Sequence, residues 1–196
     1  GILSSQLGYG LGLGIGDVNN DGYPDIYVSN DFHENDYLYI NSQDGTFTQE
    51  ARRALPHTSR FSMGNDIADV NNDGWLDIIT LDMLPRDESV IKTSAGEDSY
   101  EVYKFKLSYG FDKQVSRNAL QLNRGSVDSG RVVFSDVAQA AGVEATDWSW
   151  CPLLVDWDGD GRKDVFVTNG IVKRPNDLDY ISYMSDDSVQ RLAQNN

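Results

Sequence analysis

A nine-residue acidic pattern, Asp-x-Asn/Asp-x-Asp-Gly-x-x-Asp, occurs three times in this chain and constrains its fold more than any other feature. The copies are "DVNNDGYPD" at 17–25, "DVNNDGWLD" at 69–77 and "DWDGDGRKD" at 156–164. Each copy follows an aromatic residue at a fixed offset and precedes an apolar, β-branched run, "IYVSN", "IITLD" or "VFVTN". Three copies in matching surroundings indicate a repeated structural unit.

The segments after the first two loops complete the repeat unit. After the first loop come "DYLYIN", a "SQDG" turn and "TFTQEA", and after the second loop the corresponding pieces are "NALQLN" and "VVFSDVAQAAG". Runs of this kind predict a strand, a hairpin turn and a second strand. Each unit therefore has the content of a four-stranded antiparallel meander, which is one blade of a β-propeller.

The predicted fold class is all-β: a segment of a β-propeller built from four-stranded antiparallel blades, with a partly helical insertion and a C-terminal tail. We assign blade one to residues 1–56, blade two to 57–143, a partial blade three to 144–172 and a helical tail to 173–196. A closed propeller typically has four to eight blades, so we expect the chain to be part of a larger chain or complex. A small three-repeat domain is the alternative.

Two segments lie outside the repeat. Blade two carries an insertion at about 85–117, and its "EDSYEVYKFKLSYGFDKQ" mixes aromatic and charged residues. We regard this insertion as the best candidate for a specific contact surface. The tail is expected to be helical from about Asp177, with one apolar face formed by Leu178, Ile181, Tyr183 and Met184.

The three acidic loops are predicted to bind Ca²⁺, one ion each. Positions one, three and five carry oxygen ligands, the glycine after them permits a tight turn, the carbonyl of position seven points inward, and Asp at position nine closes the shell. The first loop would ligate through Asp17, Asn19, Asp21, the Tyr23 carbonyl and Asp25. The second would use Asp69, Asn71, Asp73, the Trp75 carbonyl and Asp77. The third would use Asp156, Asp158, Asp160, the Arg162 carbonyl and Asp164, and its four carboxylates predict the tightest binding.

Metal-free acidic turns are the alternative interpretation, because Asp, Asn and Gly favour turns in any case. Carboxylates crowded into one short loop would repel one another without a cation, which favours the metal. The loops differ from an EF-hand, which needs a Glu at position twelve where this chain has Val28, Thr80 and Val167. Their repeated position between strands favours a structural role, and such sites fill where free Ca²⁺ is millimolar, outside the cytoplasm.

The glycine run "GLGLGIG" at 10–16 resembles a phosphate-binding loop but has a different spacing. A dinucleotide fingerprint needs glycines at offsets of zero, two and five before a helix. Here the glycines occupy even positions only, so they share one face of a strand, and Tyr9, Leu11, Leu13 and Ile15 lie on the other. We predict the innermost strand of a blade, kept thin for close packing.

The composition excludes some partners. The chain has 31 Asp and Glu against 16 Lys and Arg, a net charge of −15, which disfavours nucleic acid and anionic membrane surfaces. No apolar run approaches the roughly 18 residues needed to cross a membrane. The single cysteine, Cys151, lies in "WSWCPLLV" and is predicted to be a buried, inert thiol.

No catalytic arrangement stands out, and we expect a protein that is not an enzyme. His33 and His57 are predicted to be surface or turn residues, and neither Gly-x-Ser-x-Gly nor His-Glu-x-x-His occurs. The Arg124-Gly125-Ser126 triplet is interpreted as part of a hairpin turn. The aromatic residues at repeat positions are expected to pack between blades rather than to stack on sugars.

At these residues the chain resembles the FG-GAP/VCBS-repeat β-propellers, in which the same type of loop binds Ca²⁺ between strands. The motifs are "FSMGNDIADVNNDGWLDIITLD", "YLYINSQDGTFTQEA" and "TDWSWCPLLVDWDGDGRKDVFVTNG". "DMLP", "NALQLNRG" and "VTNGIVKRPNDLDY" further resemble the large surface proteins of Bacteroidota-type bacteria that pair these repeats with an ASPIC/UnbV module. The resemblance implies a secreted or outer-membrane-associated propeller.

The expected function is therefore a calcium-stabilised extracellular β-propeller that binds or scaffolds a protein or a glycan at a bacterial cell surface. The alternative is an accessory or catalytic part of a polysaccharide-degrading enzyme. A cleft rich in aromatic residues and carboxylates would favour the enzyme, and a stable protein interface on the insertion or the tail would favour the scaffold.

Overall fold

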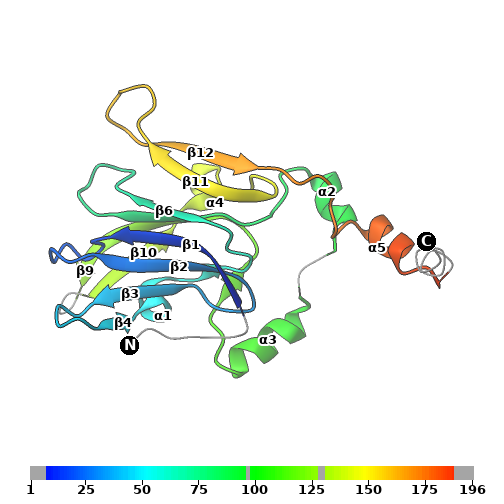
Figure 1. The fold of residues 1–196 in the computed structure, drawn as a ribbon, viewed down its shortest axis with the longest axis horizontal. Helices are drawn as coiled ribbons and strands as arrows, with labels where there is room; N and C mark the ends of the chain where they lie inside the picture. The colour runs from blue at the N-terminus through cyan, green and yellow to red at the C-terminus, as the bar shows by residue number, and fades with distance from the viewer. Residues whose placement is uncertain (1–7, 96–97, 128–130, 188–196) are drawn as a thin grey trace.

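The structure is a computed structural model that describes residues 8–95, 98–127 and 131–187. It is mostly β, with antiparallel sheets (Figure 1). The first sheet has four strands, each antiparallel to the next: β1 (Gly8–Gly16), β2 (Asp25–Phe32), β3 (Tyr37–Asn41) and β4 (Phe47–Gln49). The chain thus runs through one complete meander before residue 50.

The second sheet repeats this arrangement. Its strands, in spatial order, are β6 (Asn65–Ala68), β7 (Asp77–Thr80), β9 (Ala119–Val127) and β10 (Arg131–Asp136). A short helix that the sequence did not predict follows the last strand of each sheet: α1 (Ala51–Ala54) and α4 (Ala138–Ala141). Ala51 and Ala138 begin these helices, and both are buried among apolar side chains.

The third sheet, within the described residues, has two antiparallel strands, β11 (Ser149–Val155) and β12 (Asp164–Asn169). The insertion between β7 and β9 contains α2 (Glu88–Thr93), α3 (Tyr100–Ser108) and β8 (Gln114–Val115), and β8 pairs in parallel with β5 (Thr58–Ser59). The tail forms α5 (Leu178–Met184), capped by Asp177, and residues 188–196 lie outside the described part. The insertion and the tail are thus partly helical, as predicted.

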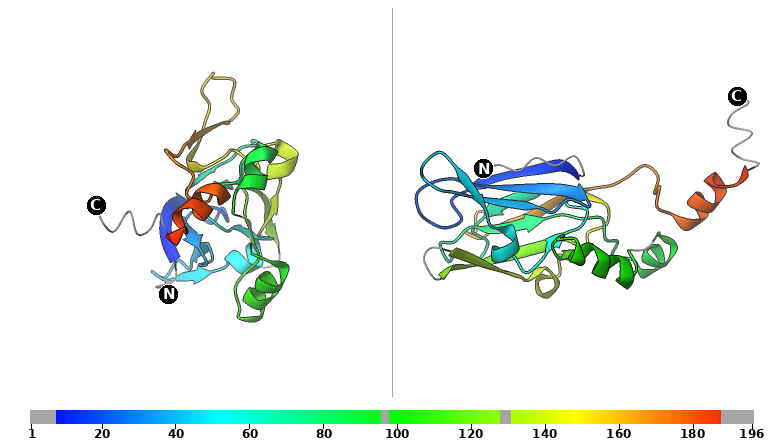
Figure 2. Two further views of the ribbon diagram at one scale, coloured as in Figure 1. Left: turned by 90° about the vertical axis from the view of Figure 1, so that its right-hand side faces the viewer. Right: turned by 90° about the horizontal axis from the view of Figure 1, so that it is seen from below.

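The three sheets stack through their first strands. β1 lies against β6, and β6 lies against β11, so the stack follows chain order (Figure 1). Figure 2 shows that α2, α3 and α5 lie at the end of the molecule opposite the acidic loops. No closed ring is formed by the described residues, and no helix among them is long and apolar enough to cross a membrane.

Two apolar clusters fill the spaces between the sheets, and neighbouring residues of β7 point into different ones. Ile78 joins Val18, Tyr27 and Leu38 between the first and second sheets. Ile79 joins a second cluster with Leu81, Leu120, Ala138 and Leu154. Successive side chains of a strand point to opposite faces, so the middle sheet is apolar on both.

The glycine strand packs as closely as its sequence predicts. A Cβ atom on Gly12 would lie 2.7 Å from Asn65 Nδ2, and one on Gly14 would lie 2.5 Å from Asn65 Oδ1. A β-bulge between Gly10 and Gly12 interrupts the alternation once. The opposite face is exposed, with Leu13 and Ile15 exposed by 64% and 62%. The glycines therefore let β6 approach the backbone of β1, which is an edge strand of its sheet.

The prediction of a buried Cys151 is wrong, because its side chain is exposed. Pro152 and Leu154 occupy the face of β11 that packs on β6, and alternation places Cys151 on the other face. The expected packing of aromatic residues between blades also fails for Tyr9, Trp150 and Trp157, which are 67%, 46% and 62% exposed. Tyr9 and Trp150 belong to the outermost sheets of the stack, and Trp157 lies in the third acidic loop.

Two smaller predictions also need correction. Arg124, Gly125 and Ser126 lie within β9 rather than in the turn, and Gly125 has φ +78° beside the Trp75 ring. The turn itself, at 128–130, lies outside the described residues. His57 is not a surface residue, because its side chain is only 12% exposed and contacts Asp136.

Candidate metal-binding loops

The three acidic loops connect the first and second strands of their sheets and lie along one edge of the molecule (Figure 1). In the first loop, Asp17 accepts hydrogen bonds from the amides of Asp21 (3.0 Å) and Gly22 (2.7 Å). The carboxylate of Asp21 accepts from the amide of Tyr23 at 2.9 Å. These bonds turn the oxygen atoms of positions one and five toward the interior of the loop.

The other two loops repeat this geometry. Asp69 accepts from the amides of Asp73 and Gly74 at 3.1 and 2.8 Å, and Asp156 accepts from those of Asp160 and Gly161 at 3.0 and 2.9 Å. Positions four and six have positive φ throughout, which Asn and Gly tolerate best. The residues are Asn20, Asn72 and Gly159 at position four, and Gly22, Gly74 and Gly161 at position six.

The aspartate at position nine ties the loop to the sheet. Asp25 accepts from the amide of Val18 at 3.0 Å and from that of Asn41, at the end of β3, at 2.8 Å. Asp77 does the same with Val70 (2.9 Å) and Asn123 (2.8 Å). Burial raises the pKa of both carboxyls, and the hydrogen bonds from the amides lower it. Repulsion from the neighbouring loop aspartates raises the pKa further. A cation in the loop would offset that repulsion.

Asp164 lies in a different environment because its sheet has no third strand among the described residues. It accepts from the amide of Trp157 at 3.0 Å and is exposed. Carboxylate oxygens of Asp156, Asp158 and Asp164 lie within 4.8 Å of one another. These three carboxylates come from the loop with the most aspartates.

The donor set of all three loops fits a hard divalent cation. Every side chain at positions one, three, five and nine offers oxygen, and Ca²⁺ prefers six to eight such ligands. Asn19 and Asn71 each present an oxygen at position three, and it accepts the amide of position five at 3.2 Å in both loops. Asp160 accepts from the amide of Arg162 at 2.8 Å, which matches Asp21 and Asp73 in the other loops.

Neighbouring loops are joined directly by the asparagine at position four. Asn20 Nδ2 donates to the Gly74 carbonyl of the second loop at 3.0 Å. Asn72 Nδ2 donates to the Gly161 carbonyl of the third loop at 2.9 Å. Position four of the third loop is Gly159, which has no side chain to continue the series. We call these two contacts the inter-loop bridges.

Sequence reasoning missed the inter-loop bridges and the strand contacts of Asp25 and Asp77. A signal was present, because Asn recurs at position four of two loops and at the ends of "YIN" and "QLN". Gln43, which donates to Asp21 Oδ2 at 3.1 Å, carries no such signal. Repetition of a residue type at one repeat position was therefore the only indication available.

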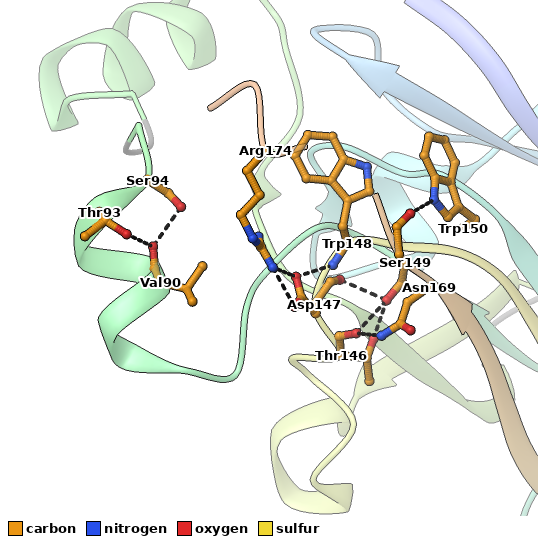
Figure 3. Close-up of polar contacts among 11 residues, drawn as sticks. Val90, Thr93, Ser94, Thr146, Asp147, Trp148, Ser149, Trp150, Asn169 and Arg174 are labelled. Carbon is orange, nitrogen blue, oxygen red and sulfur yellow. Dashed lines mark hydrogen bonds and ion pairs between the residues drawn. The ribbon is translucent and has the colours of Figure 1, made fainter. Parts of the chain in front are cut away.

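A second polar cluster joins the tail to the start of β11 (Figure 3). Arg174 Nη2 donates to both carboxylate oxygens of Asp147, at 2.5 and 2.6 Å, and the Trp148 amide donates to Oδ1 at 2.6 Å. Asp147 has φ +67°. The adjoining pocket encloses about 170 Å³. The cluster fixes the segment that leads to α5, whose cap region bonds to the insertion through Ala95 and Asn176.

A third polar cluster contains His57. His57 Nε2 lies 3.0 Å from Asp136 Oδ2, and Arg117 Nη2 lies 2.7 Å from the same oxygen. Burial acts to raise the pKa of Asp136, but its hydrogen bonds and the Arg117 charge outweigh this and lower it to about 2. Asp136 also accepts from the amides of Leu120 and Ala138, so the cluster joins β9, β10 and α4.

Comparison with known proteins identifies one family feature. No curated protein and no solved structure gives a significant match to this chain. A family model described as an FG-GAP-like repeat matches residues 17–80, from the start of the first acidic loop to the end of β7. This chain therefore contains an FG-GAP-like repeat at 17–80, which spans the first two loops.

Proposed function

We propose that this chain is a segment of a calcium-stabilised β-propeller that acts as an extracellular binding or scaffolding module at a bacterial surface. The observation that carries the proposal is the directional stacking of the three sheets. The FG-GAP-like repeat at 17–80 supports the same reading, because such repeats are associated with interaction modules.

The stacking has a direction because each first strand uses its two faces differently. Gly12 and Gly14 of β1 meet Asn65 and Ile67 of the next sheet. Asp66, at the repeat position of Gly14, accepts from the amide of Leu154 in β11 at 2.7 Å. One face of each first strand thus packs against the following sheet, and the opposite face packs against the preceding sheet.

This use of the two faces predicts which neighbouring blade each outer face of the stack would contact. Leu11, Leu13 and Ile15 occupy the face that would receive a preceding blade, and all three are exposed. Cys151 and Leu153 occupy the face of β11 that would receive a following blade, and both are exposed. Exposed apolar faces at both ends support a stack that continues into a larger propeller.

The proposed role of Ca²⁺ is structural. Bound at positions one, three, five, seven and nine of each loop, it would join the first strand of a sheet to the second and offset the loop carboxylates. Loading in a calcium-rich compartment accords with a secreted or outer-membrane-associated protein. The partner we propose is a protein or a glycan, and we propose binding rather than catalysis.

Removal of the metal tests the proposal. We expect a calcium chelator to lower the melting temperature by several degrees or more, because each site adds about 2.7 kcal/mol at a hundredfold excess of ligand over Kd. Millimolar Ca²⁺ should restore the melting temperature, and Mg²⁺ should not. Differential scanning calorimetry measures both effects.

The matched variants are Asp156→Asn, in the third loop, and Asp44→Asn, in the β3–β4 turn outside the loops. Asp156→Asn should reduce the calcium-dependent part of the melting temperature, and Asp44→Asn should leave it unchanged. An identical melting curve with and without chelator would rule out calcium stabilisation.

A further inference from the structure

Two adjoining pockets lie beside the insertion. The first encloses about 420 Å³ and the second about 340 Å³, and Asp112 lines both. The first lies between α1, the loop before β5 and the end of α3. The second lies along α3, β8 and Arg60.

The insertion builds these pockets but is not needed for the sheet. β6, β7, β9 and β10 pair without any residue of 85–117, and the first sheet has no equivalent segment. Asp98, just before α3, forms ion pairs with Arg60, which follows β5, and with Lys106 of α3, each at 3.0 Å. Gln114 Nε2 donates to the Glu34 carbonyl at 2.8 Å. These ion pairs and this hydrogen bond hold α3 in a defined position against the first two sheets.

The pockets are locally basic on a strongly acidic protein. Their charged linings are Arg52 and Lys113 in the first, Arg60 and Lys106 in the second, with Asp98 and Asp112 as the carboxylates. Arg52 pairs with Asp112 at 3.3 Å, and Asp98 is shared by Arg60 and Lys106, so the two pockets together carry two more cations than carboxylates on a chain whose net charge is −15. Lys113 is exposed and makes no ion pair with the described residues. An acidic ligand would find here a more favourable field than the net charge of the chain implies.

The first pocket also has apolar walls. Ala51, Leu55, Pro56, Leu107 and Phe111 line it. Its volume exceeds that of one large apolar side chain, and its cationic residues, Arg52 and Lys113, lie beside these walls. Apolar walls can contact a side chain of Leu, Ile or Phe, and the adjacent cations can bind carboxylates next to it. A peptide supplies both groups. A sugar ring would leave its hydroxyl groups facing hydrocarbon there.

We propose that the two pockets bind an acidic peptide segment, with an apolar side chain in the first pocket and a carboxylate at Arg60 and Lys106 in the second. This proposal rests on the proposed binding function, for which it names a site and a class of partner. Tyr100 and Tyr103 line the second pocket and would contact the peptide next to the carboxylate.

Selection from a library tests the ligand class directly. The full chain, with Ca²⁺, is used to select from a phage-displayed library of random 12-residue peptides. We expect the enriched peptides to carry Asp or Glu next to a Leu, Ile or Phe. A synthetic fluorescent copy of the consensus is then titrated by anisotropy, together with one copy in which the acids are amides and one in which the apolar residue is Ala.

Matched variants locate the site. Lys113→Glu reverses an exposed charge in the first pocket, and Lys92→Glu makes the same change on α2, where Lys92 pairs with the exposed Glu88. We expect Lys113→Glu to weaken binding of the consensus peptide by about tenfold and Lys92→Glu to leave it unchanged. Phe111→Ser should weaken the consensus peptide but not its Ala copy. Circular dichroism confirms that each variant is folded.

Three results would overturn the proposal. The first is a selection that enriches no peptide, or only peptides without the acidic and apolar pattern. The second is equal weakening by Lys113→Glu and Lys92→Glu, and the third is binding of oligogalacturonate in place of any peptide. The last result would assign the pockets to an acidic glycan. Failure of the calcium proposal is distinguishable, because it is read from the melting curve with chelator and not from peptide binding.

Discussion

At the scale of single residues, Asp36 is a carboxyl group whose pKa is strongly raised by burial. It is fully buried and accepts hydrogen bonds from the Tyr27 hydroxyl at 2.7 Å, the Ser62 hydroxyl at 3.0 Å and the Asn30 amide at 2.8 Å. Burial raises its pKa to about 7, although the three hydrogen bonds act in the opposite direction. The group is therefore uncharged in the folded protein at mildly acid pH.

The raised pKa predicts a pH-dependent contribution to stability. A carboxyl with a higher pKa in the folded state stabilises fully below its unfolded pKa, near 3.8, and loses this contribution as pH rises through 7. The Asp36→Asn variant lacks this titration. Its stability relative to the parent should therefore increase by about 2 kcal/mol between pH 5.5 and 8.5.

Urea unfolding of both proteins at fixed Ca²⁺ concentration measures this difference. Asp44→Asn, in an exposed turn, is the control and should show no such trend. A difference between parent and Asp36→Asn that stays constant over this pH range would show that Asp36 keeps its ordinary titration.

At the scale of elements, the inter-loop bridges connect one sheet to the next at the loop edge. Each bridge is a single hydrogen bond from an asparagine with positive φ to a glycine carbonyl. The natural glycine at position 159 shows which substitution the backbone accepts there. A bridge can therefore be removed without changing the conformation of its loop.

Asn20→Gly and Asn72→Gly should each lower the free energy of unfolding by about 1 kcal/mol, the usual net value of one hydrogen bond. Asn20→Ala should cost more, because Ala adds the strain of a positive φ to the lost bond. Chemical unfolding in saturating Ca²⁺ gives these values. If Asn20→Gly is as stable as the parent, the bridge does not contribute to holding the sheets together.

Elements whose sequence pattern recurs, and the tail helix with its own apolar periodicity, were predictable from the sequence, and the shortest elements were not. The three loops, the glycine strand and the strand pairs after the first two loops each had a counterpart with which to compare them. The helices α1 and α4 were missed because their sequences, "ARRA" and "AQAA", are too short for a periodic pattern. Cys151 was misplaced because an apolar run does not reveal which face of a strand is covered.

The candidate site was predictable in its ligand positions and not in its surroundings. The fifteen proposed ligands follow from the pattern alone, whereas the contacts of Asp25 with β3 and of Asp77 with β9 depend on which strand pairs with which. The two pockets beside α3 were beyond prediction, because Arg60, Asp98 and Asp112 come together only through the packing of the insertion.

At the scale of the whole molecule, the two ends of the stack are unlike and complementary. The outer face of β1 matches the faces by which the second and third sheets receive a preceding sheet. The outer face of β11 matches those that receive a following sheet. Two copies of this chain can therefore associate end to end through a head-to-tail interface, which forms a closed ring where the rotation between successive sheets returns to its start.

We expect the isolated chain to form concentration-dependent oligomers through these two outer faces. Leu13→Asp should suppress them, because it places a charge on the exposed face of β1, where Leu13 is 64% exposed. Val172→Asp is the control, since Val172 is 98% exposed and lies outside the three sheets. Sedimentation velocity over a range of concentrations measures this. A monomer at all concentrations, or equal behaviour of the two variants, would contradict end-to-end association.

The alternation of Ile78 and Ile79 determines where this chain can change its length during evolution. Loss or gain of one residue inside β7 would exchange the two side chains and leave both apolar clusters unfilled at once. The segment from 85 to 117 begins after β7 has ended and returns before β9, so its length is free of that penalty. Relatives of this chain should therefore differ in length between β7 and β9 while keeping β7 itself without insertions or deletions.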